Sequence, residues 1–170
     1  MYRNRQIIAT ETKPMKSTSH KIGGIALGSA ILLALPSGTG VIAAAGAYLG
    51  STAPDALEIP RWKEEGFWPW SRRRVRQSAV PHRTVTHWLP AWVLLALVGG
   101  FQGWPILWGF ALGGLLHVTL DWLTPMGIPV WRPDVRHSLR RVTGSGSELL
   151  WLAGVSAAIV GTGLSISYLI

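Results

Sequence analysis

The chain has 170 residues, of which 48% are apolar and 14% are charged, and its net charge is +8. Soluble domains carry about 25% charged residues, so this composition favours a membrane protein. Cysteine is absent, which excludes disulfides, thiolate nucleophiles and Cys-based zinc sites. The positive charge could indicate a nucleic-acid partner, but the cations flank apolar stretches instead of lining a polar domain. We therefore expect no nucleic-acid binding.

The first apolar stretch follows a basic N-terminal tail, residues 1–18. Residues 22–54 contain no formal charge. The segment 36–40 (Pro-Ser-Gly-Thr-Gly) divides this stretch, because Pro and Gly end helices and permit a tight reversal. The pattern predicts a helical hairpin made of Ser19–Leu35 and Val41–Ala53.

Two further apolar stretches follow. Residues 84–120 also lack formal charge, and a Gly- and Pro-containing turn at 99–105 predicts a second hairpin, His87–Val98 and Pro105–Leu123. The last stretch, Leu149–Ile170, consists of apolar or small residues. A membrane span needs about 20 residues, a length that the last two helices approach and that the first three do not.

These segments predict an all-α polytopic membrane protein: one domain, residues 1–170, with about five transmembrane helices arranged as two hairpins and a C-terminal helix. The expected loops are residues 55–86 and 124–147. Five basic residues lie before or in the first turn of the first helix, seven lie in the first loop and four in the second, and the two hairpin turns carry none. The positive-inside rule places the N-terminus and both loops in the cytoplasm and the C-terminus outside. A buried core of a soluble helical protein and a cleavable N-terminal signal peptide are the alternatives.

Ionisable residues gather at the predicted cytoplasmic ends of these helices. They are His20, Asp55, His82, His87, His117, Asp121 and Glu148. His117 and Asp121 are four residues apart and therefore share one helix face. A charged Asp at the bilayer centre costs about 2.5–3.5 kcal/mol and less toward a helix end, so this pair needs a partner or a function. Metal ligation and a mutual His–Asp hydrogen bond that joins two helices both satisfy that need.

The other candidates depend on co-location with this pair. We expect His82 in the loop and His87 in the first helical turn, where both can point at one centre. Asp55 and Glu58 are either carboxylate ligands or solvated turn residues. Glu148 either stabilises a helix N-terminus or acts as a catalytic base.

Imidazole and carboxylate groups without a thiolate suit Zn²⁺ best, and Mn²⁺ or Fe next. Such an ion polarises a carbonyl or phosphoryl oxygen and lowers the pKa of bound water toward about 7. The first hypothesis is therefore a metal-dependent hydrolase with either one ion and a base, or two ions. The alternatives are a non-enzymatic membrane protein with a structural or metal-binding cluster, and a transporter.

Several motifs occur in a recognisable order. They are Ser19-His20, Ala53-Pro54-Asp55, residues 82–87 (His-Arg-Thr-Val-Thr-His), residues 114–127 (Gly-Leu-Leu-His-Val-Thr-Leu-Asp-Trp-Leu-Thr-Pro-Met-Gly), Trp131-Arg132-Pro133 and a Gly-Ser-rich approach to Glu148. Together they resemble the bacterial predicted membrane-bound metal-dependent hydrolases, the LexA-regulated YdjM-like family.

The resemblance spans about His20 to Leu150 and implies a multi-pass protein of the bacterial inner membrane, in contact with membrane lipids. The metal ligands that it implies are His20, Asp55, His82, His87, His117 and Asp121. Glu148 or Glu58 is the expected base, and the expected substrate is a lipid or another ester or phosphoester.

The chain departs from the family pattern just after Asp55. The family usually has Pro-Asp-x-Asp-His, whereas this chain has Leu57 at the second acid and Glu58 at the next position. Trp88 replaces the small hydroxyl residue that usually follows the second histidine. If the family site holds two metals, we expect this member to hold one or to be impaired.

Overall fold

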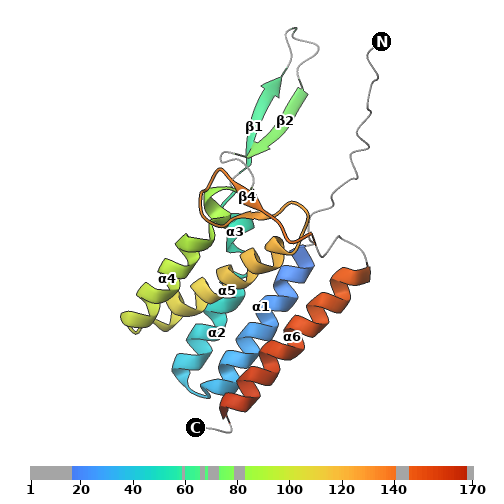
Figure 1. The fold of residues 1–170 in the computed structure, drawn as a ribbon. Coiled ribbons are helices and arrows are strands. Elements are labelled where there is room, and N and C mark those ends of the chain that lie inside the picture. Colours follow the sequence, from blue (N-terminus) through green and yellow to red (C-terminus); the bar gives the residue numbers. More distant parts are fainter. Residues whose placement is uncertain are drawn as a thin grey trace.

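A computed structural model describes residues 17–58, 60–65, 68, 73–78, 83–140 and 146–167 (Figure 1). In this part of the chain most residues are helical. The longer helices are α1 (Ser17–Ala34), α2 (Gly38–Gly50), α4 (Leu89–Phe101), α5 (Pro105–Trp122) and α6 (Gly146–Ser167). They correspond to the five predicted helices, with ends shifted by a few residues, so the all-α prediction is confirmed.

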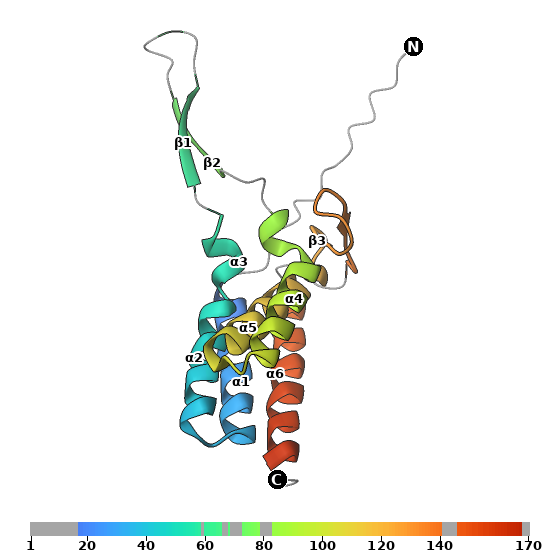
Figure 2. The same ribbon diagram turned by 90° about the vertical axis from the view of Figure 1, so that its left-hand side faces the viewer.

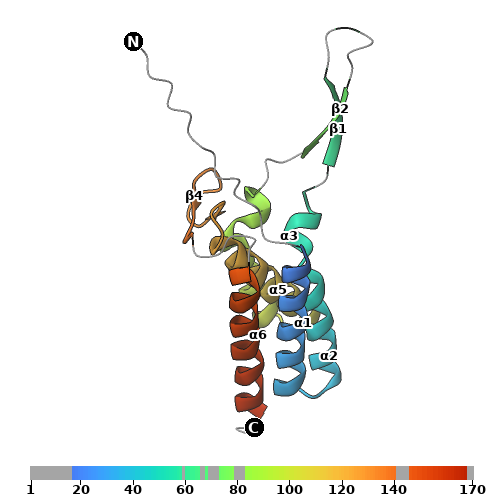
Figure 3. The same cartoon turned by 90° about the vertical axis from the view of Figure 1, so that its right-hand side faces the viewer.

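The helices form one bundle with α5 near its centre. Helix α5 packs against α2, α4 and α1, while α6 packs along α1. Two views at right angles to Figure 1 show α1, α2 and α6 side by side, with α6 beside α1 (Figures 2 and 3). The polar connections gather at one end of this bundle, which is the end that carries the ionisable candidates.

Helices α2 and α5 approach so closely that their backbones touch. A Cβ atom at Gly109 would collide with the carbonyl oxygen of Ala43, and one at Gly113 with the carbonyl oxygen of Ala47. Glycine at four-residue spacing permits this kind of helix contact. The close approach brings the C-terminal end of α2 against the C-terminal half of α5, where His117 lies.

The bundle exposes many large apolar side chains and buries a group of polar side chains alongside its apolar core. Large apolar side chains such as Ile25, Val41, Leu94 and Leu150 are more than half exposed. Buried polar or charged side chains lie at one end of the bundle; they include His20, Arg83, His87, His117, Asp121 and Glu148. Because buried ionisable groups require partners, this end of the bundle is the place to look for chemistry.

The first predicted loop contains elements that the sequence did not indicate. A short helix, α3 (Ala53–Ala56), follows α2 directly, and the 3₁₀ helix η2 (Val85–His87) precedes α4. Between them, β1 (Pro60–Glu65) pairs antiparallel with β2 (Arg73–Ser78), with Pro60 opposite Ser78. After α5, β3 (Ile128–Pro129) pairs antiparallel with β4 (Arg136–His137). These additions leave the helical class of the fold unchanged.

Within the ranges that the structure describes, no helix combines the length and the apolar content needed to cross a membrane. The five predicted helices are therefore present, but their prediction as membrane spans is not confirmed.

Candidate metal centre

His117 and Asp121 lie one turn apart on α5, and neither side chain has any exposed surface. The Nδ1 atom of His117 is 2.7 Å from the carbonyl oxygen of Ser51, at the end of α2. Because a carbonyl oxygen only accepts hydrogen bonds, Nδ1 carries the proton and donates it. In the neutral ring the lone pair of Nε2 is then available as a ligand.

His87 is held in the same way by different partners. It ends η2, is fully buried, and places Nδ1 3.3 Å from Oε1 of Glu58 and 3.0 Å from the Thr86 hydroxyl. A carboxylate that accepts the Nδ1 proton fixes the tautomer of a ligating histidine and raises its basicity. The Nε2 atom of His87 points at Nε2 of His117, 3.3 Å away.

Asp55 joins these groups from α3, one turn beyond Ser51. Its Oδ1 atom lies 3.4 Å from Nε2 of His87 and 3.6 Å from Nε2 of His117. The Asp55 side chain is 45% exposed, unlike the other three members of the group. Access to the cluster from outside the bundle is therefore past Asp55.

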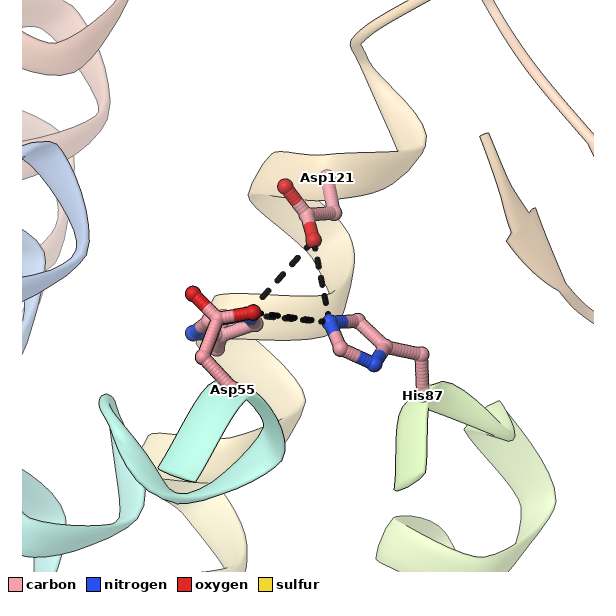
Figure 4. Close-up of side chains that lie close together, drawn as sticks. Asp55, His87 and Asp121 are labelled. Atoms are coloured by element: carbon pink, nitrogen blue, oxygen red, sulfur yellow. Dashed lines mark hydrogen bonds and ion pairs between the residues drawn. The ribbon is translucent and has the colours of Figure 1, made fainter. Parts of the chain in front are cut away.

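The four side chains define a compact group of ligand atoms, and Figure 4 labels three of them, Asp55, His87 and Asp121. Oδ2 of Asp121 lies 3.2 Å from Nε2 of His87 and 3.5 Å from Nε2 of His117. All four ligand atoms lie within 4.8 Å of one another. Metal–ligand bonds of about 2.0–2.1 Å place neighbouring ligands of a tetrahedral zinc ion about 3.3 Å apart. The separations that involve the two Nε2 atoms, 3.2–3.6 Å, are close to that value.

The polar atoms of this cluster fit a cation better than they fit one another. Oδ2 of Asp121 is buried and has no hydrogen-bond partner among the described residues. The two Nε2 atoms face each other, although the contacts at Nδ1 leave each neutral ring with a lone pair there. A divalent ion would interact favourably with this Asp121 oxygen and with the two imidazole lone pairs at the same time.

A buried arginine lies on the outer side of Asp121. Arg83 is 2% exposed, and its Nη2 atom is 2.7 Å from Oδ1 of Asp121. Its Nη1 atom donates to the Thr124 hydroxyl at 2.9 Å. In the sequence analysis Arg83 counts only as one of the seven basic residues of the first loop. Its position between the two histidines of the 82–87 motif is the signal that could have indicated a role at the site.

His20 lies beside the cluster, and Glu148 contacts Ser19, the residue before His20. His20 stacks on the His117 ring with a centroid separation of 3.7 Å and an interplanar angle of 16°. Its Nε2 atom is 3.5 Å from Oδ1 of Asp121. Glu148, at the start of α6, is buried and accepts a hydrogen bond from the hydroxyl of Ser19. His82 lies outside the described residues.

The structure thus brings together most of the residues that the sequence singled out. A family model described as YdjM inner membrane protein matches residues 15–169, nearly the whole chain. The chain belongs to this family. No curated protein and no solved structure matches the chain.

Membership of an inner membrane protein family agrees with the resemblance drawn from the motifs. The structure also locates Leu57 and Glu58, the two residues that depart from the family pattern after Asp55. Leu57 has no carboxylate to offer the cluster, and its side chain is more than half exposed. Glu58 instead contacts three groups of the 83–87 segment through Oε1: the Arg83 amide at 2.8 Å, the Thr86 hydroxyl at 3.1 Å and Nδ1 of His87. Glu58 therefore holds the segment that presents His87.

The protonation states of Asp55 and His87 depend on each other. Burial raises the pKa of Asp55, but hydrogen bonds from His117 and His87 outweigh it and leave the pKa well below its usual range. Burial lowers the pKa of His87, whereas the adjacent carboxylates of Asp121 and Asp55 raise it, and the net pKa is above its usual value. Without a metal, a proton on His87 thus partly neutralises the carboxylates.

Proposed function

We propose that this chain is a membrane-embedded metal-dependent hydrolase with its site at the cytoplasmic face. The substrate class we propose is an ester or phosphoester carried by a membrane lipid. Zinc is the first choice of metal, because the imidazole and carboxylate donors and their tetrahedral separations suit it, and Mn²⁺ or Fe is the second choice.

One observation carries this proposal. Two buried histidines present Nε2 toward two aspartates at 3.2–3.6 Å, while their Nδ1 atoms are fixed by an outer carbonyl and an outer carboxylate. A histidine that donates its second ring N–H to a carbonyl or carboxylate is the usual arrangement around a protein-bound metal. A pair of solvated histidines would not need these partners.

The residues have distinct roles in this proposal. A bound divalent ion would polarise an ester or phosphoryl oxygen and lower the pKa of a water molecule toward about 7. Asp55 is the exposed member of the cluster and admits the substrate. Glu58 accepts from Nδ1 of His87 and orients that ring, which favours an orienting role for Glu58 over proton transfer. Glu148 remains our proposed base.

The membrane setting follows from the family and from the outer surface of the bundle. Helices α1, α2, α4, α5 and α6 are the proposed spans, because their outward side chains include exposed Ile25, Val41, Leu94 and Leu150. The hairpin turns at 35–37 and 102–104 carry no charge, whereas every basic residue lies toward the other end of the predicted topology. This charge asymmetry supports our proposal that the metal centre lies at the cytoplasmic face.

Elemental analysis of the detergent-purified protein tests the metal, and a lipid and phosphoester hydrolysis panel tests the reaction. We expect the parent protein to hold metal and to hydrolyse at least one substrate, and His117→Ala/Asp121→Ala to lose both. His137→Ala is the matched control, since His137 is exposed and distant in the chain from the cluster residues. A parent protein that holds no metal would refute the proposal.

A second candidate is a metal-binding membrane protein without turnover. The observation that favours it is that four protein ligand atoms lie within 4.8 Å of one another, the number of ligands that closed structural zinc sites have. This function predicts that His117→Ala lowers thermal stability while the metal-loaded parent hydrolyses nothing in the panel. The exposure of Asp55 favours the hydrolase, because an exposed carboxylate can leave room for a substrate oxygen.

A further inference from the structure

The Arg83 guanidinium lies on the side of Asp121 that faces away from the two Nε2 atoms of the cluster. The two oxygens of Asp121 face different partners. Oδ2 points at the two Nε2 atoms of the cluster, whereas Oδ1 is 2.7 Å from Nη2 of Arg83. A carboxylate that bridges two metal ions with one oxygen to each ion needs both oxygens for metal, and here Oδ1 is paired with a cation that belongs to the chain.

Both the backbone amide and the side chain of Arg83 are held by hydrogen bonds. Its amide donates to Oε1 of Glu58 at 2.8 Å, and its guanidinium donates to Asp121 and Thr124. Its φ of 56° lies in the left-handed region, which is unfavourable for a residue with a side chain. A conformation of this kind persists where its surroundings hold it, and such residues concentrate at functional sites.

His20 is excluded from the cluster ion by its orientation. An imidazole binds metal through a lone pair that lies in the plane of its ring. The His20 ring stacks nearly parallel to that of His117 at 3.7 Å, so an ion in the plane of His117 lies far outside the plane of His20. His20 could meet only a different ion, and its Nε2 atom lies 3.5 Å from Oδ1 of Asp121, the oxygen that Arg83 occupies.

From this geometry we propose that the centre holds one metal ion, and that the Arg83 guanidinium takes the place of a second cation between Asp121 and His20. Arg83 is a positioning residue: it fixes Asp121 with one oxygen turned inward and neutralises the other. The inference rests on the proposed function, because it assumes that the inner cluster binds a metal.

Metal counting tests the inference independently of catalysis. Purified protein is saturated with Zn²⁺, freed of excess ion and analysed for metal per chain, and a Mn²⁺-loaded sample is examined by electron paramagnetic resonance. We expect one ion per chain and an uncoupled six-line Mn²⁺ spectrum. His20→Ala should keep one ion, whereas His117→Ala should lose it. Two ions per parent chain, a spin-coupled Mn²⁺ pair or loss of the ion in His20→Ala would overturn the inference.

Variants of Arg83 test its own role. Arg83→Lys keeps a cation at Oδ1 of Asp121 and should retain one ion, whereas Arg83→Met frees that oxygen and should admit a second ion. The second ion should disappear again in His20→Ala/Arg83→Met. A single ion in Arg83→Met would overturn the role of Arg83. If that variant does not fold, the one-metal assignment is still decided by the number of ions in the parent, in Arg83→Lys and in His20→Ala. A parent protein with no metal would instead refute the proposed function, and this inference with it.

Discussion

Glu58 shows at the scale of one residue how a departure from a family pattern can be accommodated. Its Oε1 atom accepts from the Arg83 amide and the Thr86 hydroxyl and lies 3.3 Å from Nδ1 of His87. Glu58→Gln should keep the first two contacts through its amide oxygen but remove the charge that makes His87 a stronger ligand. We expect metal affinity to fall about tenfold with little change in fold, measured by competition with a chelator.

Asp134→Asn is the matched control for this variant, because Asp134 is an exposed acid paired with exposed Arg132. Its metal affinity should equal that of the parent. An unchanged affinity in Glu58→Gln would show that Glu58 supports the chain segment without tuning His87.

His87 also makes the metal affinity depend on pH. Its pKa lies above the usual histidine value, because the adjacent carboxylates of Asp121 and Asp55 outweigh burial. A metal must displace the proton on Nε2, so protonation competes with binding, and the competition weakens as the pH rises through that pKa. We expect the apparent affinity for Zn²⁺ to increase as the pH rises through the raised pKa of His87, with protons released on binding. Calorimetry in buffers of different ionisation enthalpy measures both, and a flat profile would contradict the raised pKa.

At the scale of elements, the contact between α2 and α5 determines whether the site forms. A Cβ atom at Gly113 would collide with the carbonyl oxygen of Ala47 and press on the Ser51 amide, next to the carbonyl that fixes His117. Gly113→Val should therefore push the helices apart, cost about 1–3 kcal/mol of stability and abolish metal binding. Gly154→Ala is the control, since a Cβ atom there would meet none of the described residues within 4 Å; thermal unfolding with and without Zn²⁺ compares them. Parent-like metal binding in Gly113→Val would contradict this account.

The five long helices could be predicted from the sequence, whereas most contacts between the helices and loops could not. Charge-free stretches interrupted by Pro and Gly located all five long helices, because those residues end helices by local chemistry. The i,i+4 pair on α5 was predictable for the same local reason. The stacking of His20 on His117 and the burial of Arg83 were not, because they depend on how α1, α5 and the 83–87 segment meet, and no local pattern encodes that meeting.

At the scale of the whole molecule, the bundle has one polar and one uncharged end, and this asymmetry predicts its orientation. The turn around Gln102 carries no charge, whereas the connection that contains Asp134 also carries basic residues. Because basic residues are retained in the cytoplasm, the Asp134 connection and the metal centre should face inward, and the Gln102 turn should face outward.

The cysteine-free sequence allows a direct test of that orientation. Gln102→Cys and Asp134→Cys place single thiols at exposed positions at opposite ends of the bundle. A membrane-impermeant maleimide should label Gln102→Cys in intact spheroplasts, and should label Asp134→Cys only after the membrane is opened. The parent protein, which has no thiol, controls for background labelling. Labelling of Asp134→Cys in intact spheroplasts would place the metal centre on the outer face, where its substrate would have to be an extracytoplasmic ester.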